Sequence, residues 1–96
     1  NGNGLLATNI NEDGSIIYQE TLAQGYSVND VFVYGNLIGL AVGHDGALIY
    51  NWDGTDSFTL KGRLETSYSN AIKINDHTIF IATEDGIEVI QIDFTP

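Results

Sequence analysis

Oxygen-bearing side chains with a calcium-loop spacing occur near the N-terminus, in the pattern Asn9-x-Asn11-x-Asp13-Gly14-x5-Glu20. This spacing matches an EF-hand loop except at its first position, where Asn stands for Asp, and oxygen atoms are the ligands that calcium prefers. An EF-hand also needs a helix on each side of the loop. Residues 16–18 are Ile-Ile-Tyr, which favours a strand, so we predict a turn between strands and no metal site.

The residue types that perform catalysis are scarce. His44 and His77 are the only imidazoles, and Cys is absent, which excludes thiol catalysis, disulfides and cysteine-based zinc sites. The Gly-x-Ser-x-Gly motif of hydrolases and the glycine-rich phosphate loops are also missing. We place the two histidines at opposite ends of the predicted strands, where they cannot share a metal ion or a catalytic unit. We therefore predict no catalytic residues, no cofactor, and a protein that is not an enzyme.

Acidic residues far outnumber basic ones, with thirteen Asp and Glu against three Lys and Arg, for a net charge of -10. Nucleic-acid binding needs several basic side chains to displace counterions from phosphates, and anionic membranes repel an acidic surface. No run approaches the roughly 18 apolar residues of a membrane-spanning helix. We therefore predict no nucleic-acid partner and no membrane insertion. Because residue 1 is Asn, we also expect a processed chain or a piece of a larger protein.

Four kinds of short segment recur along the chain in a fixed order. The clearest is an Asp-Gly pair followed by an apolar run, at residues 13–19, 45–51 and 85–91. The last two copies start 40 positions apart and the first two start 32 apart. The second kind, an aliphatic residue followed by Ala, occurs at 6–8, 40–42 and 81–83. The third, a Tyr-Ser pair ahead of an apolar run, occurs at 26–33 and 68–74. The fourth, a pair ending in Leu, precedes each Tyr-Ser pair, at 21–22 and 63–64.

These segments are short, rich in β-branched and aromatic residues and separated by turn dipeptides, so we predict strands rather than helices. The Asp-Gly pairs predict tight turns, because Gly tolerates the positive φ that such turns need. The expected strands are of four kinds: 29–34 and 70–74; 5–8, 37–42 and 78–83; 15–19, 47–52 and 87–92; and 59–65, with a shorter counterpart near 20–23.

Four antiparallel strands in a unit of about 40 residues predict the blades of a β-propeller. We expect an all-β chain in which residues 1–96 form a single partial-propeller unit: an incomplete blade at 5–23, a complete blade at 29–65 and an incomplete blade at 70–92. A blade cannot bury both of its apolar faces alone, so blades stack. The chain is too short to close a ring, which leaves three solutions: part of a longer propeller, a ring of several copies, or a β-sandwich.

The stretch from Tyr68 to Asp93 resembles the LVIVD repeat of bacterial and archaeal surface propellers. That repeat runs from a Tyr-rich turn through two apolar strands to a closing Gly-Leu-x-Ile-Val-Asp. Here the closing element reads Gly-Ile-Glu-Val-Ile-Gln-Ile-Asp at 86–93, and an earlier copy reads Gly-Ala-Leu-Ile-Tyr-Asn-Trp-Asp at 46–53. The resemblance implies an extracellular or cell-envelope interaction scaffold, with no shared catalytic residues.

One end of the predicted blades gathers Tyr, Ser, Asn and Asp from loops, which are the usual carriers of recognition on a rigid scaffold. We take as candidate binding residues Tyr26, Ser27, Asn29, Asp45, Tyr68, Asn70 and Asp85. Turn formation alone is the alternative interpretation, because turns need the same residue types. We also place Glu12, Asp13 and His44 at this end. Trp52 is expected to cap the core, with a sugar platform as the alternative.

The function predicted from these observations is a non-enzymatic, extracellular or cell-surface module that displays loops on one propeller face to a protein or glycan partner. The alternative is a carbohydrate-binding lectin assembled as a homo-oligomeric propeller. In either case the blades need a neighbour, which is the remainder of a propeller or other copies of the chain. The enzyme alternative is a propeller fragment of a larger hydrolase. The sequence disfavours it, because it offers no His together with a nucleophile and a carboxylate.

Overall fold

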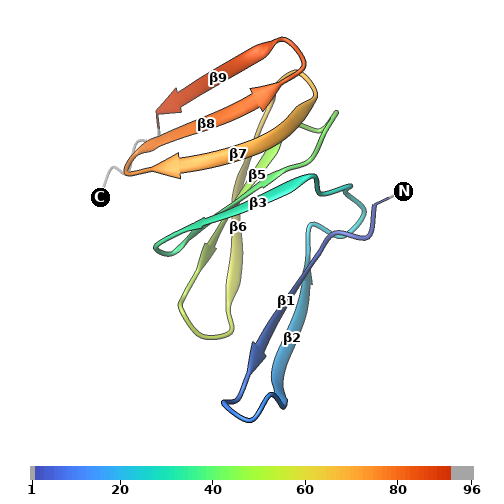
Figure 1. Cartoon of the computed structure of the whole chain (residues 1–96), viewed down its shortest axis with the longest axis vertical. Coiled ribbons are helices and arrows are strands. Elements are labelled where there is room, and N and C mark those ends of the chain that lie inside the picture. Colours follow the sequence, from blue (N-terminus) through green and yellow to red (C-terminus); the bar gives the residue numbers. More distant parts are fainter. Residues whose placement is uncertain (1, 92–96) are drawn as a thin grey trace.

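The computed structural model describes residues 2–91, and these residues form an all-β fold with no helix. The nine strands form three separate antiparallel sheets (Figure 1). The first sheet is the hairpin β1–β2, the second has four strands in the order β3-β4-β5-β6, and the third has the order β7-β8-β9. The strands are β1 (Leu5–Ile10), β2 (Ile16–Leu22), β3 (Asp30–Tyr34), β4 (Leu37–Ala41), β5 (Ala47–Trp52), β6 (Phe58–Leu64), β7 (Ser69–Asn75), β8 (Thr78–Thr83) and β9 (Gly86–Gln91).

Each of the three Asp-Gly pairs that precede an apolar run forms the turn between two antiparallel strands, as the sequence predicted. The three turns join β1 to β2, β4 to β5, and β8 to β9. Their glycines have φ angles of 91° at Gly14, 81° at Gly46 and 129° at Gly86, values that a residue with a Cβ rarely adopts. Each of these turns joins two neighbouring strands of one sheet through a short loop.

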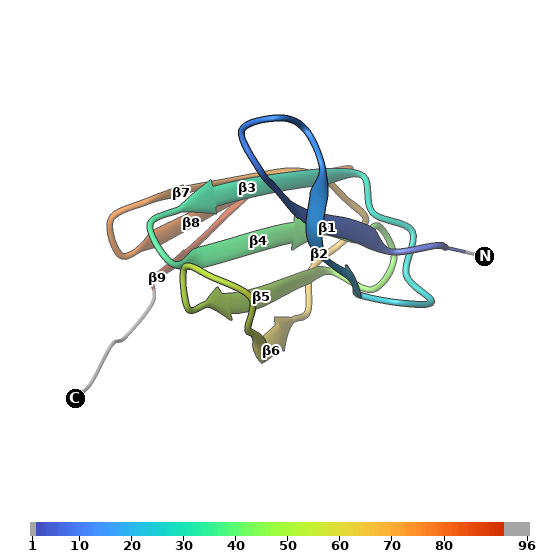
Figure 2. The same ribbon diagram turned by 90° about the horizontal axis from the view of Figure 1, so that it is seen from below.

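The four-stranded sheet is the centre of the molecule, because each of its faces packs against another part of the chain. Side chains alternate between the two faces of a strand. One face packs against the third sheet around the buried residues Ala41, Ala47, Ile49, Ile72, Ile74, Ile79 and Ile81. The opposite face carries Ile38, Leu40, Val42 and Leu48, and it packs against Leu5, Ala23, Tyr26 and Val28 from the first hairpin and the loop after it. Figure 2 shows the sheets from a second direction.

A glycine allows the central and third sheets to approach closely. A Cβ at Gly39 would lie 2.8 Å from Cδ1 of Ile72 and 3.2 Å from Cδ1 of Ile74. Asp30 adds a polar link across the same interface, because its Oδ2 accepts a hydrogen bond of 3.0 Å from the backbone N–H of Ile72. The two sheets are therefore held together by apolar packing and by a specific hydrogen bond.

The first unit differs from the expectation, since it contains two strands and no separate strand near 20–23. Residues 20–22 continue β2 and pair with β1, with Leu22 opposite Leu5 and Glu20 opposite Ala7. The strand ends at Ala23, where φ is +53°. The prediction was wrong because β1 supplies a partner backbone along the whole of β2. Residue 92, the last of the expected strand 87–92, lies outside the described residues.

The orientation of the first hairpin is a second correction. Its open end is tied to the loop after β2, through a bridge between Gly2 and Gly25 and a hydrogen bond of 3.0 Å from Gly4 N to Tyr26 O. The turn with Glu12 and Asp13 therefore lies one strand length away, at the bottom of Figure 1, whereas the β4–β5 loop lies at the top. Glu12 and Asp13 do not share the end of the molecule where they were expected.

The β5–β6 loop, residues 53–57, is organised by one carboxylate. Oδ1 of Asp53 accepts backbone hydrogen bonds from Thr55 (2.8 Å), Asp56 (3.1 Å) and Ser57 (3.1 Å). These bonds, led by those from Thr55 and Ser57, hold the pKa of Asp53 below its ordinary value of 3.8. A carboxylate with a lowered pKa in the folded state stabilises the fold above its unfolded-state pKa, and this contribution is lost as the pH falls through the lowered pKa.

We therefore expect Asp53→Asn to flatten the acid side of the stability profile. The wild-type protein loses stability as the pH falls below about 4, and the Asp53→Asn variant should lose less over the same interval. Urea unfolding at a series of pH values measures the difference. Asp56→Asn is the matched control, because it removes a charge from the same loop and leaves the hydrogen bonds to Asp53 in place. Identical acid slopes for wild type and Asp53→Asn would contradict the assignment.

Candidate functional site

Three loops meet at the end of the molecule where β2, β4 and β6 finish: residues 23–29, 42–46 and 65–68. Ser69 joins two of them. Its backbone N–H donates to Gly43 O (3.0 Å) and its Oγ to Gly46 O (2.6 Å), and the residue is fully buried. Because a buried hydroxyl without a partner is costly, these bonds hold the loops in a defined geometry. The sequence places Ser69 in a repeated Tyr-Ser pair but does not reveal that it holds two loops together by hydrogen bonds.

Tyr68 lies at the centre of this loop end. Its ring meets the imidazole of His44 edge to face, with the ring centroids 4.8 Å apart and an interplanar angle of 81°. Nδ2 of Asn29 donates to Tyr68 Oη (3.4 Å) and to the backbone O of Ser69 (2.9 Å). The half-buried Tyr68 ring is thus held from two sides, by one residue from the β2–β3 loop and one from the β4–β5 loop.

A pocket of about 290 Å³ opens among these loops. Its polar side chains are those of Ser27, His44, Asp45 and Tyr68, and the remaining lining comes from Gly2, Gly25, Val42 and Gly43. Asp45 is exposed, and its backbone O accepts a hydrogen bond of 2.9 Å from Arg63 Nη1. A hydroxyl, a carboxylate, an imidazole and a phenol around one opening can donate and accept hydrogen bonds and can present a ring face to a ligand.

The structure brings together four of the seven candidate residues. Ser27, Asp45 and Tyr68 line the pocket, and Asn29 holds Tyr68 in place. Tyr26 instead packs against the apolar cluster on the central sheet. His44 was placed at this end but was not named as a candidate, although its position beside Asp45 in the β4–β5 turn was a usable signal.

The other two candidates lie apart from the pocket. Asp85 belongs to the β8–β9 turn, where its Oδ2 accepts a hydrogen bond of 2.5 Å from Ser67 Oγ. Asn70 is exposed on β7, at an irregularity of the pairing between Ser69 and Ala71. Both positions are polar surface adjacent to the loop end, and neither side chain lines the opening.

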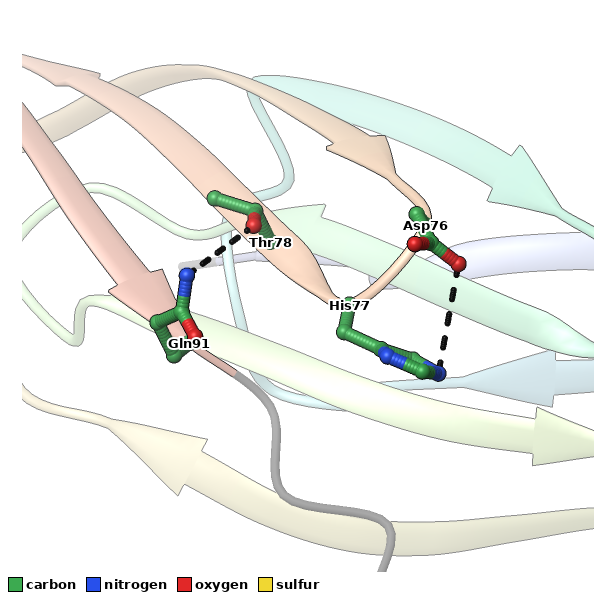
Figure 3. A network of polar contacts seen from close by, with 4 residues as sticks. All are labelled: Asp76, His77, Thr78 and Gln91. Carbon is green, nitrogen blue, oxygen red and sulfur yellow. Dashed lines mark hydrogen bonds and ion pairs between the residues drawn. The ribbon is translucent and has the colours of Figure 1, made fainter.

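The second imidazole lies at the other end of the third sheet (Figure 3). His77 is in the β7–β8 turn, with its Nε2 3.9 Å from Asp76 Oδ1, and Gln91 Nε2 donates to Thr78 Oγ1 at 3.5 Å on the neighbouring strands. His44 follows Gly43, which forms a bridge with Ser69 at the start of β7. His77 lies beyond the other end of this seven-residue strand, so the length of the strand, about 20 Å, separates the two histidines. The two histidines do not share a site, as expected.

The calcium-like pattern near the N-terminus forms a hairpin turn between strands. Oδ1 of Asp13 accepts from Ser15 N (2.9 Å) and Ser15 Oγ (2.7 Å), and these bonds lower the pKa of Asp13. Asn11 Nδ2 also donates to Ser15 Oγ (2.8 Å). Within residues 2–91 no three His, Asp or Glu side chains are arranged to hold a metal ion. Since the same residues form no helix, they contain no candidate for a helical membrane span.

Trp52 packs where the sequence placed it, at the edge of the apolar core. Its ring stacks on Phe58 with centroids 6.2 Å apart, and both residues contact the cluster around Ile38 and Leu48. The indole Nε1 is buried and has no hydrogen-bond partner among the described residues. The Trp52 ring is half-buried, with Phe58 stacked against it.

Comparison of the chain with known proteins finds no match among family models, curated proteins or solved structures.

Proposed function

We propose that this chain is a non-enzymatic interaction module, built from propeller-like blades of the LVIVD type, that binds a partner through its loop end. The observation that carries the proposal is the pocket shared by three loops. Ser27, Asp45 and Tyr68 were selected from the sequence for recognition, and they line one opening together with His44. The LVIVD resemblance adds an extracellular or cell-envelope setting to the proposal.

The packing of the sheets supports the blade interpretation. Ile79 and Ile81 of β8 pack against the central sheet, and the corresponding residues of β4, Ile38 and Leu40, pack in the direction of the first hairpin. Each sheet thus turns the same face toward the unit before it in the chain. This head-to-tail stacking is what a propeller requires, and a two-layered sandwich would instead turn two like faces toward each other.

The pocket chemistry indicates the kind of ligand. An exposed carboxylate in a protein with a net charge of -10 favours a cationic or neutral polar group. The Tyr68 ring offers a flat apolar surface, and the surrounding hydroxyl and imidazole offer hydrogen bonds. A basic peptide segment of a protein partner satisfies these groups best.

A glycan is the second candidate, favoured by the combination of an aromatic ring with Asp45 and Ser27 at one opening. In that case the chain is a lectin, and its blades are completed by other copies of itself. A glycan array identifies this outcome, together with a solution mass that is a multiple of 10.4 kDa.

NMR titration tests the proposed site directly. Lys- and Arg-containing dipeptides and neutral monosaccharides serve as probes, and amide shifts are recorded over the whole chain. We expect saturable shifts at residues 25–29, 42–46 and 66–69 with one of these probe classes. Shifts confined to other parts of the chain, or no saturable shift with either class, would overturn the proposed site.

Substitution of Tyr68 provides the matching prediction. A central aromatic residue commonly contributes about 2 kcal/mol or more to binding, so Tyr68→Ala should weaken binding of the active probe roughly 30-fold. His44→Asn, at an exposed position, should weaken it less and leaves the fold intact. Tyr34→Ala is the control, because Tyr34 lies at the other end of β3 and is 41% exposed. Equal affinity in all three variants would contradict the role of the pocket.

A further inference from the structure

The third sheet has one strand fewer than the central sheet. β6 pairs with β5 and completes the four-stranded sheet. In the third sheet, β9 corresponds to β5; it pairs with β8 and forms the sheet edge, and residues 2–91 contain no counterpart of β6 (Figure 1). The backbone N–H and C=O groups along this edge are available for pairing with another chain.

A groove of about 450 Å³ lies beside this edge, opposite β6. Its apolar lining comes from both sheets: Leu37, Ile49, Leu64, Ile79 and Ile90. All five residues also belong to, or pack against, the core between the central and third sheets. The groove is therefore the open outer end of an interface that is already formed within the chain.

The central sheet shows what fills the equivalent place. Phe58 of β6 packs onto the core between the central sheet and the first hairpin, while the backbone of β6 pairs antiparallel with β5. An extended segment beside β9 would make the same two kinds of contact. Its backbone would pair with the β9 edge, and its inward side chains would enter the groove.

Charge distinguishes this groove from the rest of the surface. Lys61 and Arg63 are among its lining residues, and Lys61 supplies the basic side chain, because Arg63 pairs with Leu48 on the other face of the sheet and donates from Nη1 to Asp45 O. Gly62, between them, leaves the groove open, because a Cβ at this position would meet no atom within 4 Å. In a protein with a net charge of -10, this local positive charge favours a segment with acidic side chains.

We propose that the edge of β9 and this groove together bind an extended strand of a partner protein, with alternating apolar and acidic residues, paired antiparallel with β9. The strand completes the third sheet and closes the end of its core. This surface is separate from the pocket at the loop end, so the two proposals are tested independently.

The probe is the acetylated, fluorescent peptide Ile-Glu-Val-Glu-Ile-Thr-Val, added to the full chain. We expect saturable binding and slower amide hydrogen exchange over β9, with exchange in β1 and β2 unchanged. The same peptide with Pro in place of Val and Ile at its centre cannot pair along an edge and should not bind. Absence of saturable binding, or protection located on another strand, would overturn the proposal.

Two variants locate the strand in the groove. Gly62→Leu places a side chain in the open space and should weaken peptide binding at least about tenfold, because the inward side chains lose their room. Lys61→Glu should weaken it about threefold or more, as expected for reversal of an exposed charge beside an acidic peptide. Lys73→Glu is the matched control, since Lys73 lies outside the groove, over the Phe32 ring.

The outcomes of this comparison are distinct. Normal folding of Gly62→Leu together with wild-type affinity would overturn the groove as the binding site. Equal loss of affinity in Lys61→Glu and Lys73→Glu would show a general charge effect and would overturn the local charge complementarity. Loss in Gly62→Leu and Lys61→Glu alone supports the proposal.

Discussion

Gly46→Ala is expected to cost at least about 3 kcal/mol of unfolding free energy, one of the largest effects of a single methyl group in this chain. A Cβ at this position would lie 2.0 Å from the carbonyl O of Leu64 and 3.1 Å from its carbonyl C. The φ of Gly46 is also +81°, which adds backbone strain for any residue with a Cβ. Both atoms in the clash belong to the backbone, so no side-chain rotation relieves it.

The loop cannot simply move away from this clash. The backbone O of Gly46 accepts hydrogen bonds from Ser69 Oγ (2.6 Å) and from Val42 N (2.9 Å). A shift of the loop would break the buried bond to Ser69 and leave its hydroxyl unpaired. Because a domain of this size has a total stability of roughly 5–15 kcal/mol, the variant should lose a large part of its stability.

Gly14→Ala is the matched control for this prediction. Gly14 occupies the same place in an Asp-Gly turn, with a φ of +91°, but a Cβ there would meet no atom within 4 Å. It should cost only the strain of a positive φ, about 1–2 kcal/mol. Urea unfolding of both variants, followed by circular dichroism, measures the difference. Similar losses in the two variants would contradict the close approach of β6 to the β4–β5 turn.

Ile81→Ala is the second prediction, with an expected loss of about 2–5 kcal/mol. Ile81 is fully buried between the central and third sheets, in a cluster with Ile72 and Ile79. Truncation removes apolar contacts and leaves a cavity that close-packed neighbours fill only in part. The loss should appear as a lower urea midpoint, with unfolding still cooperative.

Ile87→Ala is the control, because it truncates the same residue type on the other, exposed face of the same sheet. Ile87 is 71% exposed, so its truncation should change stability by less than about 0.5 kcal/mol. A loss at Ile87 as large as that at Ile81 would contradict the assignment of the inner and outer faces of β7–β9. A small loss at Ile81 would contradict the packing of the two sheets.

Most strand positions were predictable because they depend on local properties. β5 and β8 have the bounds that residues 47–52 and 78–83 predicted; β3 and β4 differ by one residue at one end, and β6 and β7 by one residue at each end. Runs of β-branched and aromatic residues favour extended backbone, and an Asp-Gly pair tolerates a positive φ wherever it lies. These preferences act over a few residues, so the sequence displays them directly.

The arrangement of the first hairpin was not predictable in the same way. The Asp-Gly pair at 13–14 predicted a turn correctly, but not the end of the molecule at which the turn lies. That end is decided by the bridge between Gly2 and Gly25 and by burial of Ala23 against the central sheet. A local pattern does not specify which end of a hairpin packs against the rest of the protein.

The candidate site was also predictable only in part. Its residue types followed from the sequence, whereas the meeting of Ser27, Asp45 and Tyr68 at one pocket needed three loops to be placed in space. The two Tyr-Ser pairs illustrate the limit. Ser27 is exposed and Ser69 is fully buried, although their neighbours in the sequence are alike.

The sequence by itself determined where the chain extends and turns, how acidic its surface is, and which side chains are available for recognition. Only the tertiary structure decided that Ser69 holds two loops together, that Tyr26 faces the core while Tyr68 faces a pocket, and that β9 forms an open edge beside a groove. Backbone preference is a property of a few neighbouring residues. Burial and hydrogen-bond partners come from residues distant in the chain, and they exist only once the sheets have packed.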